Sequence, residues 1–131
     1  MKIILDGMGG DNAPEAIVEG AVLASKEIQH QIAIIGKEDL IKNELKKYKY
    51  DEAKIHVINA EEVITNDEAP VRAVRSKKDS SIVKGINMVK SGDGDIFVSA
   101  GSTGALLAGG LFILGRIPGI DRPALASIYP I

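Results

Sequence analysis

Small residues and hydroxyl groups follow a short apolar run within the segment Asp95–Gly110. Ile96–Val98 is bounded by turn residues and predicts a buried strand, whereas the Ala- and Leu-rich sequence from Ala105 onward predicts a helix. The loop between them would aim backbone N–H groups and a helix N-terminus at one point, an arrangement that suits an anion. The alternative is a tight turn in which a Ser or Thr caps the helix and no ligand binds. The substrate-binding candidates in this loop are small or carry a hydroxyl: Ser99, Ala100, Gly101, Ser102, Thr103 and Gly104.

A second glycine-rich loop follows the predicted strand Lys2–Leu5 and has glycines at positions 7, 9 and 10. It nearly matches the dinucleotide fingerprint, but Asn12 stands where the third glycine belongs. Lys37, at the end of the second predicted strand, stands where an acidic residue would hold a ribose. These two departures disfavour a nicotinamide site.

The same loop places two carboxylates at the carboxyl end of the first strand, the edge where open α/β sheets bind ligands. We expect Asp6 and Asp11 to act there, with Gly9, Gly10 and Asn12 contacting the substrate. Alternatively, Asp11 and Asn12 cap the following helix, whose first turn would contain a proline.

Four cations within seven residues form the third candidate, Arg72, Arg75, Lys77 and Lys78. Such a run is usually a solvated helix face. However, Ser80 and the residue after it open a predicted helix, and this adds an N-terminus that favours anions. Two helix N-termini and four cations could therefore meet over one pocket.

The composition excludes several classes of protein. The chain has 131 residues, 45% of them hydrophobic and 26% charged, as expected for one globular domain. A net charge of −2 gives no sign of a nucleic-acid surface, and the absence of Cys excludes a disulfide framework and a thiolate nucleophile. Two histidines are too few for a His-rich metal site. No signal peptide or membrane span is apparent, so a cytoplasmic location is the default expectation.

Alternating strands and helices must position these candidates. We predict strands at Lys2–Leu5, Ile32–Ile35, Lys54–Ile58, Ile96–Val98 and Ala124–Ile128. Helices are predicted through Ile17–Ile28, over Asp39–Lys47, from Ser80, and over Leu106–Leu114, which is apolar nearly all round and should be buried. This order favours a single α/β domain over residues 1–131, with a doubly wound, largely parallel sheet and helices on both faces.

Four blocks of sequence together carry a resemblance to a known family: residues 6–14, 68–78, 99–105 and 115–124. They resemble the bacterial phosphate acyltransferase of phospholipid synthesis, in the order and spacing of that family. Gly7 and Ser102 stand where the family commonly has Ala and Asn, and both changes keep small or polar character. Family members are more than twice as long, so the resemblance is to their N-terminal portion.

The resemblance implies both a fold and a reaction. The fold would be the three-layer sandwich of the isocitrate and isopropylmalate dehydrogenase type, usually as a homodimer. The enzyme would move a fatty acyl group from acyl carrier protein to inorganic phosphate, without metal or nucleotide, giving acyl phosphate. Peripheral membrane association through the C-terminal part is a further expectation.

The site follows from the resemblance and the residues together. The expected catalytic residues are Asp6, Asp11, Lys77 and Lys78, with Arg72, Arg75 and Ser80 joining the two loops in binding phosphate or the acyl group. We also expect the isolated chain to self-associate and to form negligible acyl phosphate. The rival interpretations are a dehydrogenase of similar fold, which an NADH titration would detect, and a non-catalytic fragment.

Overall fold

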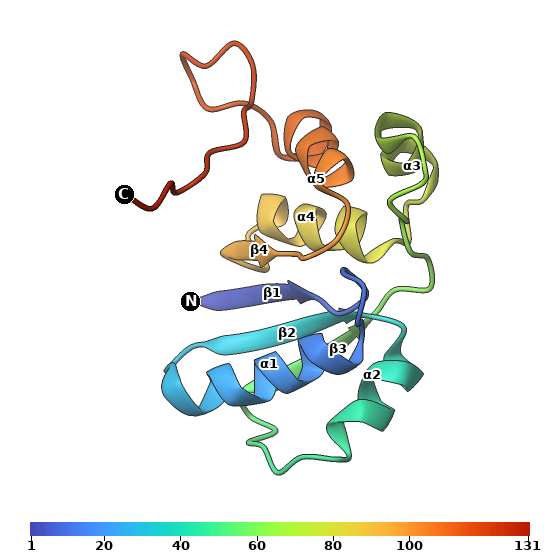
Figure 1. The fold of residues 1–131 in the computed structure, drawn as a ribbon, viewed down its shortest axis with the longest axis vertical. Helices are drawn as coiled ribbons and strands as arrows, with labels where there is room; N and C mark the ends of the chain where they lie inside the picture. The colour runs from blue at the N-terminus through green and yellow to red at the C-terminus, as the bar shows by residue number, and fades with distance from the viewer.

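Short apolar runs form the central sheet of the protein, for which a computed structural model describes residues 1–131. The strands are β1 (Lys2–Asp6), β2 (Gln31–Gly36), β3 (Ile55–Asn59) and β4 (Ile96–Val98). They lie in the order β3-β2-β1-β4, and every pairing is parallel (Figure 1). The predicted α/β class, the parallel sheet and the first four strands are therefore confirmed. The expected burial of Ile96–Val98 is wrong, because β4 lies at the edge of the sheet and leaves Ile96 and Val98 exposed.

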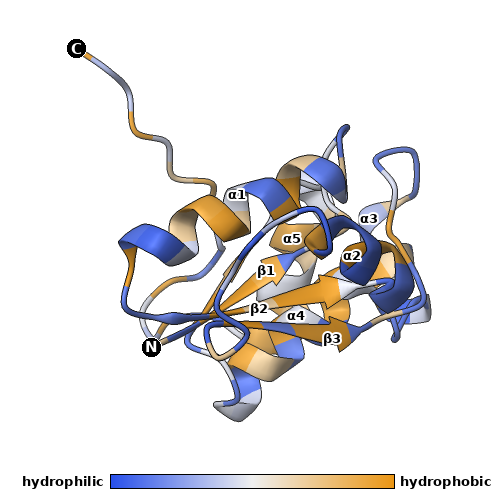
Figure 2. Cartoon of the chain, turned by 90° about the horizontal axis from the view of Figure 1, so that it is seen from below, coloured by the Kyte–Doolittle hydropathy of each residue, from blue (hydrophilic) through white to orange (hydrophobic).

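Helices α1 (Glu15–Glu27) and α2 (Glu38–Leu45) cover one face of the sheet (Figure 1). Val18 and Val22 of α1 and Ile41 of α2 pack there against Ile32 and Ile34 of β2. Because successive side chains of a strand point to opposite faces, the intervening residues of β2 serve a second core on the other face. This explains why β2 is apolar along its length, as the orange strands in Figure 2 show.

The opposite face is covered by α4 (Ser81–Ser91), with α3 (Pro70–Ser76) and α5 (Thr103–Gly109) beyond it. A further cluster joins these three helices, through Val74, Ile82 and Ala105 among others. No helix combines the length and the apolar character that crossing a bilayer requires. The result is three layers, with helices above and below the sheet.

The chain reverses its direction across the sheet at β1. From β1 it proceeds through β2 to β3, and it then returns through α3 and α4 to place β4 on the other side of β1. β1 and β4 are consequently neighbours although 93 residues separate Ile3 from its partner Ile96. The carboxyl ends of such a strand pair form the crevice where doubly wound sheets bind ligands.

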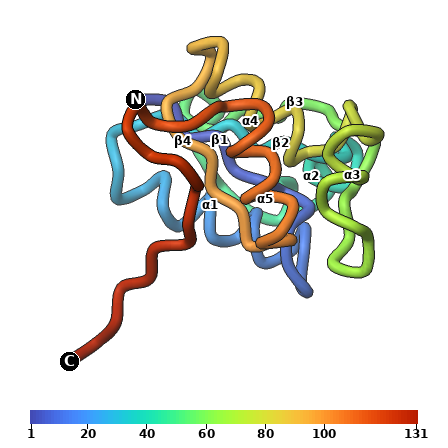
Figure 3. Tube along the Cα trace, turned by 90° about the horizontal axis from the view of Figure 1, so that it is seen from above, coloured from blue at the N-terminus to red at the C-terminus, as the bar shows by residue number.

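Two predicted elements differ from the structure. Ala124–Ile128 is not a strand: the chain after Gly115 has no regular structure, and its last part extends away from the body (Figure 3). Leu125 and Ile128 are 64% and 99% exposed, because a segment of high strand propensity forms no strand without a partner ladder.

The predicted Leu106–Leu114 helix is also divided and incompletely buried. α5 ends at Gly109, and the chain continues as a π-helical turn, η1 (Gly110–Leu114). Ala105 and Ala108 are buried against α3 and α4, but Phe112 and Leu114 are about half exposed since no element of this chain covers that side.

The start of α1 is a third correction. The helix begins at Glu15, and Pro14 occupies the capping position without a side-chain hydrogen bond. Asn12 contributes its backbone carbonyl, which accepts the amide of Ala16 at 2.9 Å. The predicted side-chain cap at Asp11 or Asn12 is therefore wrong, because the capping position is occupied by Pro14, whose side chain has no hydrogen-bonding group.

Candidate functional site

The two glycine-rich loops predicted from the sequence meet at the carboxyl ends of β1 and β4. Leu5 of β1 pairs with Val98 of β4, so the residues that follow each strand emerge side by side. Asp6, at the end of β1, is 1% exposed. The structure thus brings the first and third sequence blocks together at the point where the chain reverses direction.

A chain of hydrogen bonds joins the loops. Ser99 Oγ donates to Asp6 Oδ2 at 2.7 Å, and the same hydroxyl oxygen accepts the amide of Gly101 at 3.0 Å. Asp6 Oδ1 accepts the amide of Met8, also at 3.0 Å. One buried carboxylate therefore joins both loops, because it accepts hydrogen bonds from a hydroxyl of one and an amide of the other.

Gly9 lies at the closest approach of the loops. A Cβ placed on it would stand 2.7 Å from Asp6 Oδ2, 2.8 Å from the Gly101 nitrogen and 2.9 Å from Ser99 Oγ. Gly10 adopts a φ of 101°, a left-handed conformation that favours glycine. Glycine is therefore needed at these two positions because of the close backbone contact and the left-handed conformation, and not because of a dinucleotide-binding motif.

A cavity of about 160 Å³ opens beside the joined loops. The β1–α1 loop, the start of α5 and a third segment between β3 and α3 form its walls. Its lining comprises Met8, Gly9, Gly10, Asp11, Val63, Ile64, Thr65, Asn66, Gly101 and Ser102. Five of the predicted site residues are among them: Gly9, Gly10, Asp11, Gly101 and Ser102.

The third wall, residues 63–66, was missed in the sequence. Its signal was present, because Thr65 and Asn66 are turn-forming polar residues that follow β3 at the same edge of the sheet. The charge run that comes directly after them is more conspicuous.

The two serines at helix starts act as caps. Ser102 Oγ accepts the amide of Ala105, and Ser80 Oγ accepts the amide of Val83, each at 3.2 Å. Ser80 is fully buried and does not line the cavity. Its expected role in binding substrate finds no support in this placement, because its hydroxyl is already used within α4. Thr103 and Gly104 are both exposed on the first turn of α5. A Cβ added to Gly104 would lie 2.7 Å from Pro70 Cγ, so this glycine allows α5 to pack closely against α3.

The four cations do not converge on the cavity. Arg75 lies over the ring of Phe112, 5.1 Å from its centroid, and so connects α3 with η1. Arg72 lines a separate hollow of about 280 Å³ on α3. Lys78 is exposed, and Lys77 is bonded to Val63 and Glu68. The expectation that four cations and two helix N-termini share one pocket is therefore wrong, because none of the four lines the cavity and Arg75 and Lys77 contact other parts of the chain.

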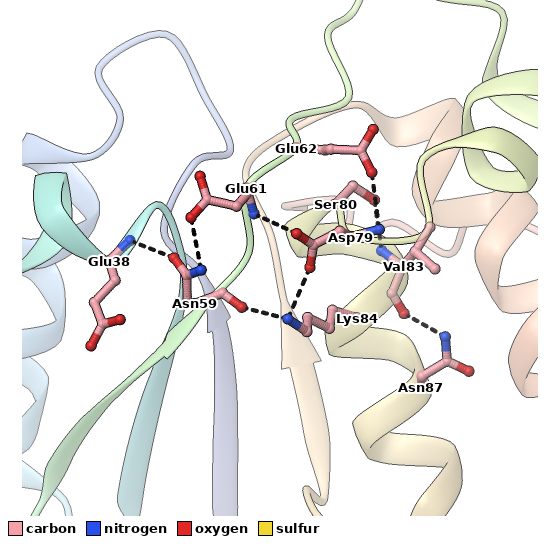
Figure 4. Close-up of polar contacts among 9 residues, drawn as sticks. All are labelled: Glu38, Asn59, Glu61, Glu62, Asp79, Ser80, Val83, Lys84 and Asn87. Atoms are coloured by element: carbon pink, nitrogen blue, oxygen red, sulfur yellow. Dashed lines mark hydrogen bonds and ion pairs between the residues drawn. The ribbon is translucent and has the colours of Figure 1, made fainter.

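Polar contacts at the end of β3 hold residues 59–62, which lead into the third wall (Figure 4). Lys84 Nζ donates to Asp79 Oδ1 at 2.9 Å and to the carbonyl of Asn59 at 2.6 Å. Asp79 Oδ2 accepts the amide of Glu61 at 3.1 Å. The hydrogen bond from Lys84, followed by that from the Glu61 amide, lowers the pKa of Asp79. The charge pair thus connects α4 with the segment entering the cavity wall.

Comparison with known proteins agrees with the four sequence blocks. The family model described as "Fatty acid synthesis protein" matches residues 1–131. The chain is 55% identical over 130 residues to a phosphate acyltransferase of Clostridioides difficile, which covers 99% of this chain and 38% of that relative. It is 56% identical to one of Clostridium botulinum (strain ATCC 19397 / Type A) and 51% identical to one of Halothermothrix orenii, each over 131 residues, 99% of this chain and 39% of the relative. The chain therefore spans roughly two fifths of the length of these curated relatives. Because the family model matches from the first residue to the last, this chain belongs to the fatty acid synthesis protein family.

Proposed function

We propose that this chain forms the phosphate-binding part of a phosphate acyltransferase of lipid synthesis. The observation that carries the proposal is the identity of 55% to a protein of that name, extending over 99% of the chain. The junction of two glycine-rich loops at the reversal point of the sheet supports it. The resemblance implies a fatty acyl thioester of acyl carrier protein as donor and acyl phosphate as product.

The reaction needs a phosphate oxygen held against the thioester carbonyl carbon. A C–O bond forms to phosphate, the C–S bond breaks, and the carrier leaves as its thiol. Phosphate is itself the nucleophile, so a chain without Cys suffices. The protein must position the phosphate, keep part of its hydration shell away and stabilise the oxyanion that develops on the carbonyl oxygen.

Backbone groups around the cavity are suited to this positioning. Gly9, Gly10 and Gly101 bring main-chain atoms to the surface of the cavity without intervening side chains. Ser99 and Asp6 hold the two loops in register, so we assign them an orienting role. Asp11 is the carboxylate that lines the cavity, where it can accept a hydrogen bond from a P–OH group of phosphate.

The cavity is large enough for only one of the two substrates. A volume of about 160 Å³ suits inorganic phosphate, whereas a fatty acyl chain requires a long apolar groove. We therefore infer that this chain supplies the phosphate side of the reaction. The acyl group would approach the open mouth of the cavity from outside.

Titration of inorganic phosphate into the ¹⁵N-labelled chain tests the proposal. We expect the amide shifts to concentrate in residues 8–11 and 99–105, and sulfate to compete for them. Shifts that avoid both loops at millimolar phosphate would refute the site.

The transfer step is tested in a polypeptide of the relatives' length that carries this segment. There, Gly9→Ala should abolish acyl-phosphate release and Gly20→Ala should leave it intact.

A further inference from the structure

The wall segment Val63–Glu68 depends on one lysine that lies outside the cavity. Lys77, at the C-terminal end of α3, is absent from the cavity lining, and its side chain is 29% exposed. Its Nζ donates to the carbonyl of Val63 at 2.7 Å and contacts Glu68 Oε1 at 2.8 Å and Oε2 at 2.9 Å. The ammonium therefore connects both ends of the wall segment.

Two hydrogen bonds and an ion pair already engage the lysine. Of the three N–H groups of the ammonium, one donates to the Val63 carbonyl and one to Glu68 Oε2, while Glu68 Oε1 lies 2.8 Å from Nζ. The ammonium is therefore held against the wall segment, and Lys77 does not line the cavity. In addition, the adjacent Glu68 carboxylate offsets the positive charge that would otherwise attract an anion.

Glu68 transmits the constraint to the cavity surface. Its Oε2 accepts the amide of Thr65 at 2.7 Å and the hydroxyl of the same residue at 3.2 Å. Thr65 lines the cavity. Contact with Lys77, and secondarily with the Thr65 amide, lowers the pKa of Glu68, so the carboxylate that holds the loop remains ionised.

We propose that Lys77 is a positioning residue, which fixes the wall segment Val63–Glu68 through Val63 and Glu68 and so governs phosphate binding without touching phosphate. The inference rests on the proposed function, since it assumes that the cavity binds phosphate. It assigns the lysine a different role from that expected of a cation in a basic cluster. Its charge is needed for the loop and not for the ligand.

Glu68→Gln separates the two roles, because they predict effects of opposite sign. If Lys77 contacted phosphate, neutralising Glu68 would release the ammonium and tighten phosphate binding. If Lys77 positions the wall, Glu68→Gln and Lys77→Gln should both weaken phosphate binding, by about five- to tenfold for the loss of a charge-assisted hydrogen bond. The double variant should bind no worse than the weaker single variant, because both changes break one unit.

Amide hydrogen exchange supplies a readout that needs no ligand. Lys77→Gln should accelerate exchange at Thr65, whose amide is bonded to Glu68, while exchange in the sheet stays unchanged. Lys77→Arg should restore protection and phosphate affinity together, since a guanidinium also donates to carboxylate and carbonyl oxygens. Lys90→Gln, at an exposed position near the end of α4, is the charge-matched control.

The outcomes are distinct for the proposal and for the function on which it rests. Tighter phosphate binding by Glu68→Gln, or unchanged exchange at Thr65 in Lys77→Gln, would overturn the positioning role. Wild-type chain that binds no phosphate would overturn the proposed function, and the exchange comparison would still decide whether Lys77 orders the wall.

Discussion

Ser99 Oγ donates a hydrogen bond of 2.7 Å to Asp6 Oδ2 across 93 positions of sequence. The bond joins the ends of β1 and β4, and through them the two loops that line the cavity. Asp6 takes part in no ion pair. The Asp6 carboxylate therefore accepts hydrogen bonds from the Ser99 hydroxyl and the Met8 amide, and it holds these two groups in place. A carboxylate that binds a basic ligand would instead pair with a positive charge.

Replacing Asp6 with Ala should destabilise the whole sheet edge. The change leaves the partly buried Ser99 hydroxyl and the Met8 amide without their acceptor, at a cost of about 1–3 kcal/mol in the free energy of unfolding. Urea denaturation followed by circular dichroism measures it. Asp39→Ala, at an exposed position of α2, should change stability by less than about 0.5 kcal/mol. Equal effects of the two variants would contradict the organising role.

Adding a methyl group at Gly9 should separate the loops. The new Cβ would overlap Asp6 Oδ2, Ser99 Oγ and the Gly101 nitrogen, so at least one of these must move. We expect Gly9→Ala to cost about 1–3 kcal/mol by overpacking and to abolish phosphate-dependent amide shifts. Gly20→Ala is the matched control, because a Cβ there meets nothing within 4 Å and should stabilise α1 by about 0.5–1 kcal/mol. Normal phosphate shifts in Gly9→Ala would show that the close approach is unimportant.

Sequence patterns sufficed for the sheet because β2 is apolar on both faces and the other strands are short, mainly apolar runs between turn residues. Ile32–Ile35 had no other interpretation than a buried strand between turn residues, and the parallel order followed from the helices between strands. The two loops could also be predicted, since topology brings the carboxyl ends of β1 and β4 to one edge.

The misinterpreted parts depend on contacts that no local pattern contains. Ala124–Ile128 has the composition of a strand, but a strand forms only beside another, and β4 gains no such neighbour in this chain. Lys77 looked like a ligand for anions, yet its partner Glu68 lies nine residues earlier and becomes apparent only when the wall segment folds back. The sequence shows that cations are present, but it does not show which groups form ion pairs or hydrogen bonds with them.

Arg75 and Phe112 should be energetically coupled. The guanidinium lies 5.1 Å from the ring centroid, within the range of a cation–π interaction, and both side chains are substantially exposed. A double-mutant cycle with Arg75→Ala and Phe112→Leu should give a coupling energy of about 0.5–1 kcal/mol in urea unfolding. Arg72→Ala combined with Phe112→Leu is the control pair and should be additive. A coupling near zero for Arg75 would mean that α3 and η1 are joined by other contacts alone.

Acid should loosen the cavity wall before it unfolds the sheet. The pKa values of Glu68 and Asp79 are lowered below their ordinary values of 4.5 and 3.8, chiefly by hydrogen bonds from Lys77 and Lys84, respectively. The unfolded chain therefore binds these protons more readily than the folded chain, and the free energy of unfolding rises with pH across this window. The contribution is fully present above the ordinary values and is lost as the pH falls through the lowered ones.

The measurement is a series of urea midpoints between about pH 6 and about pH 3, combined with exchange at Thr65. The Glu68→Gln, Asp79→Asn double variant should show a shallower loss of stability below about pH 4.5 than the wild type, because it no longer takes up these two protons on unfolding. Glu27→Gln with Asp39→Asn removes the same charge from exposed carboxylates outside the ion pairs and should retain the wild-type slope. Parallel slopes for the wild type and the Glu68, Asp79 variant would show that neither ion pair holds the wall in solution.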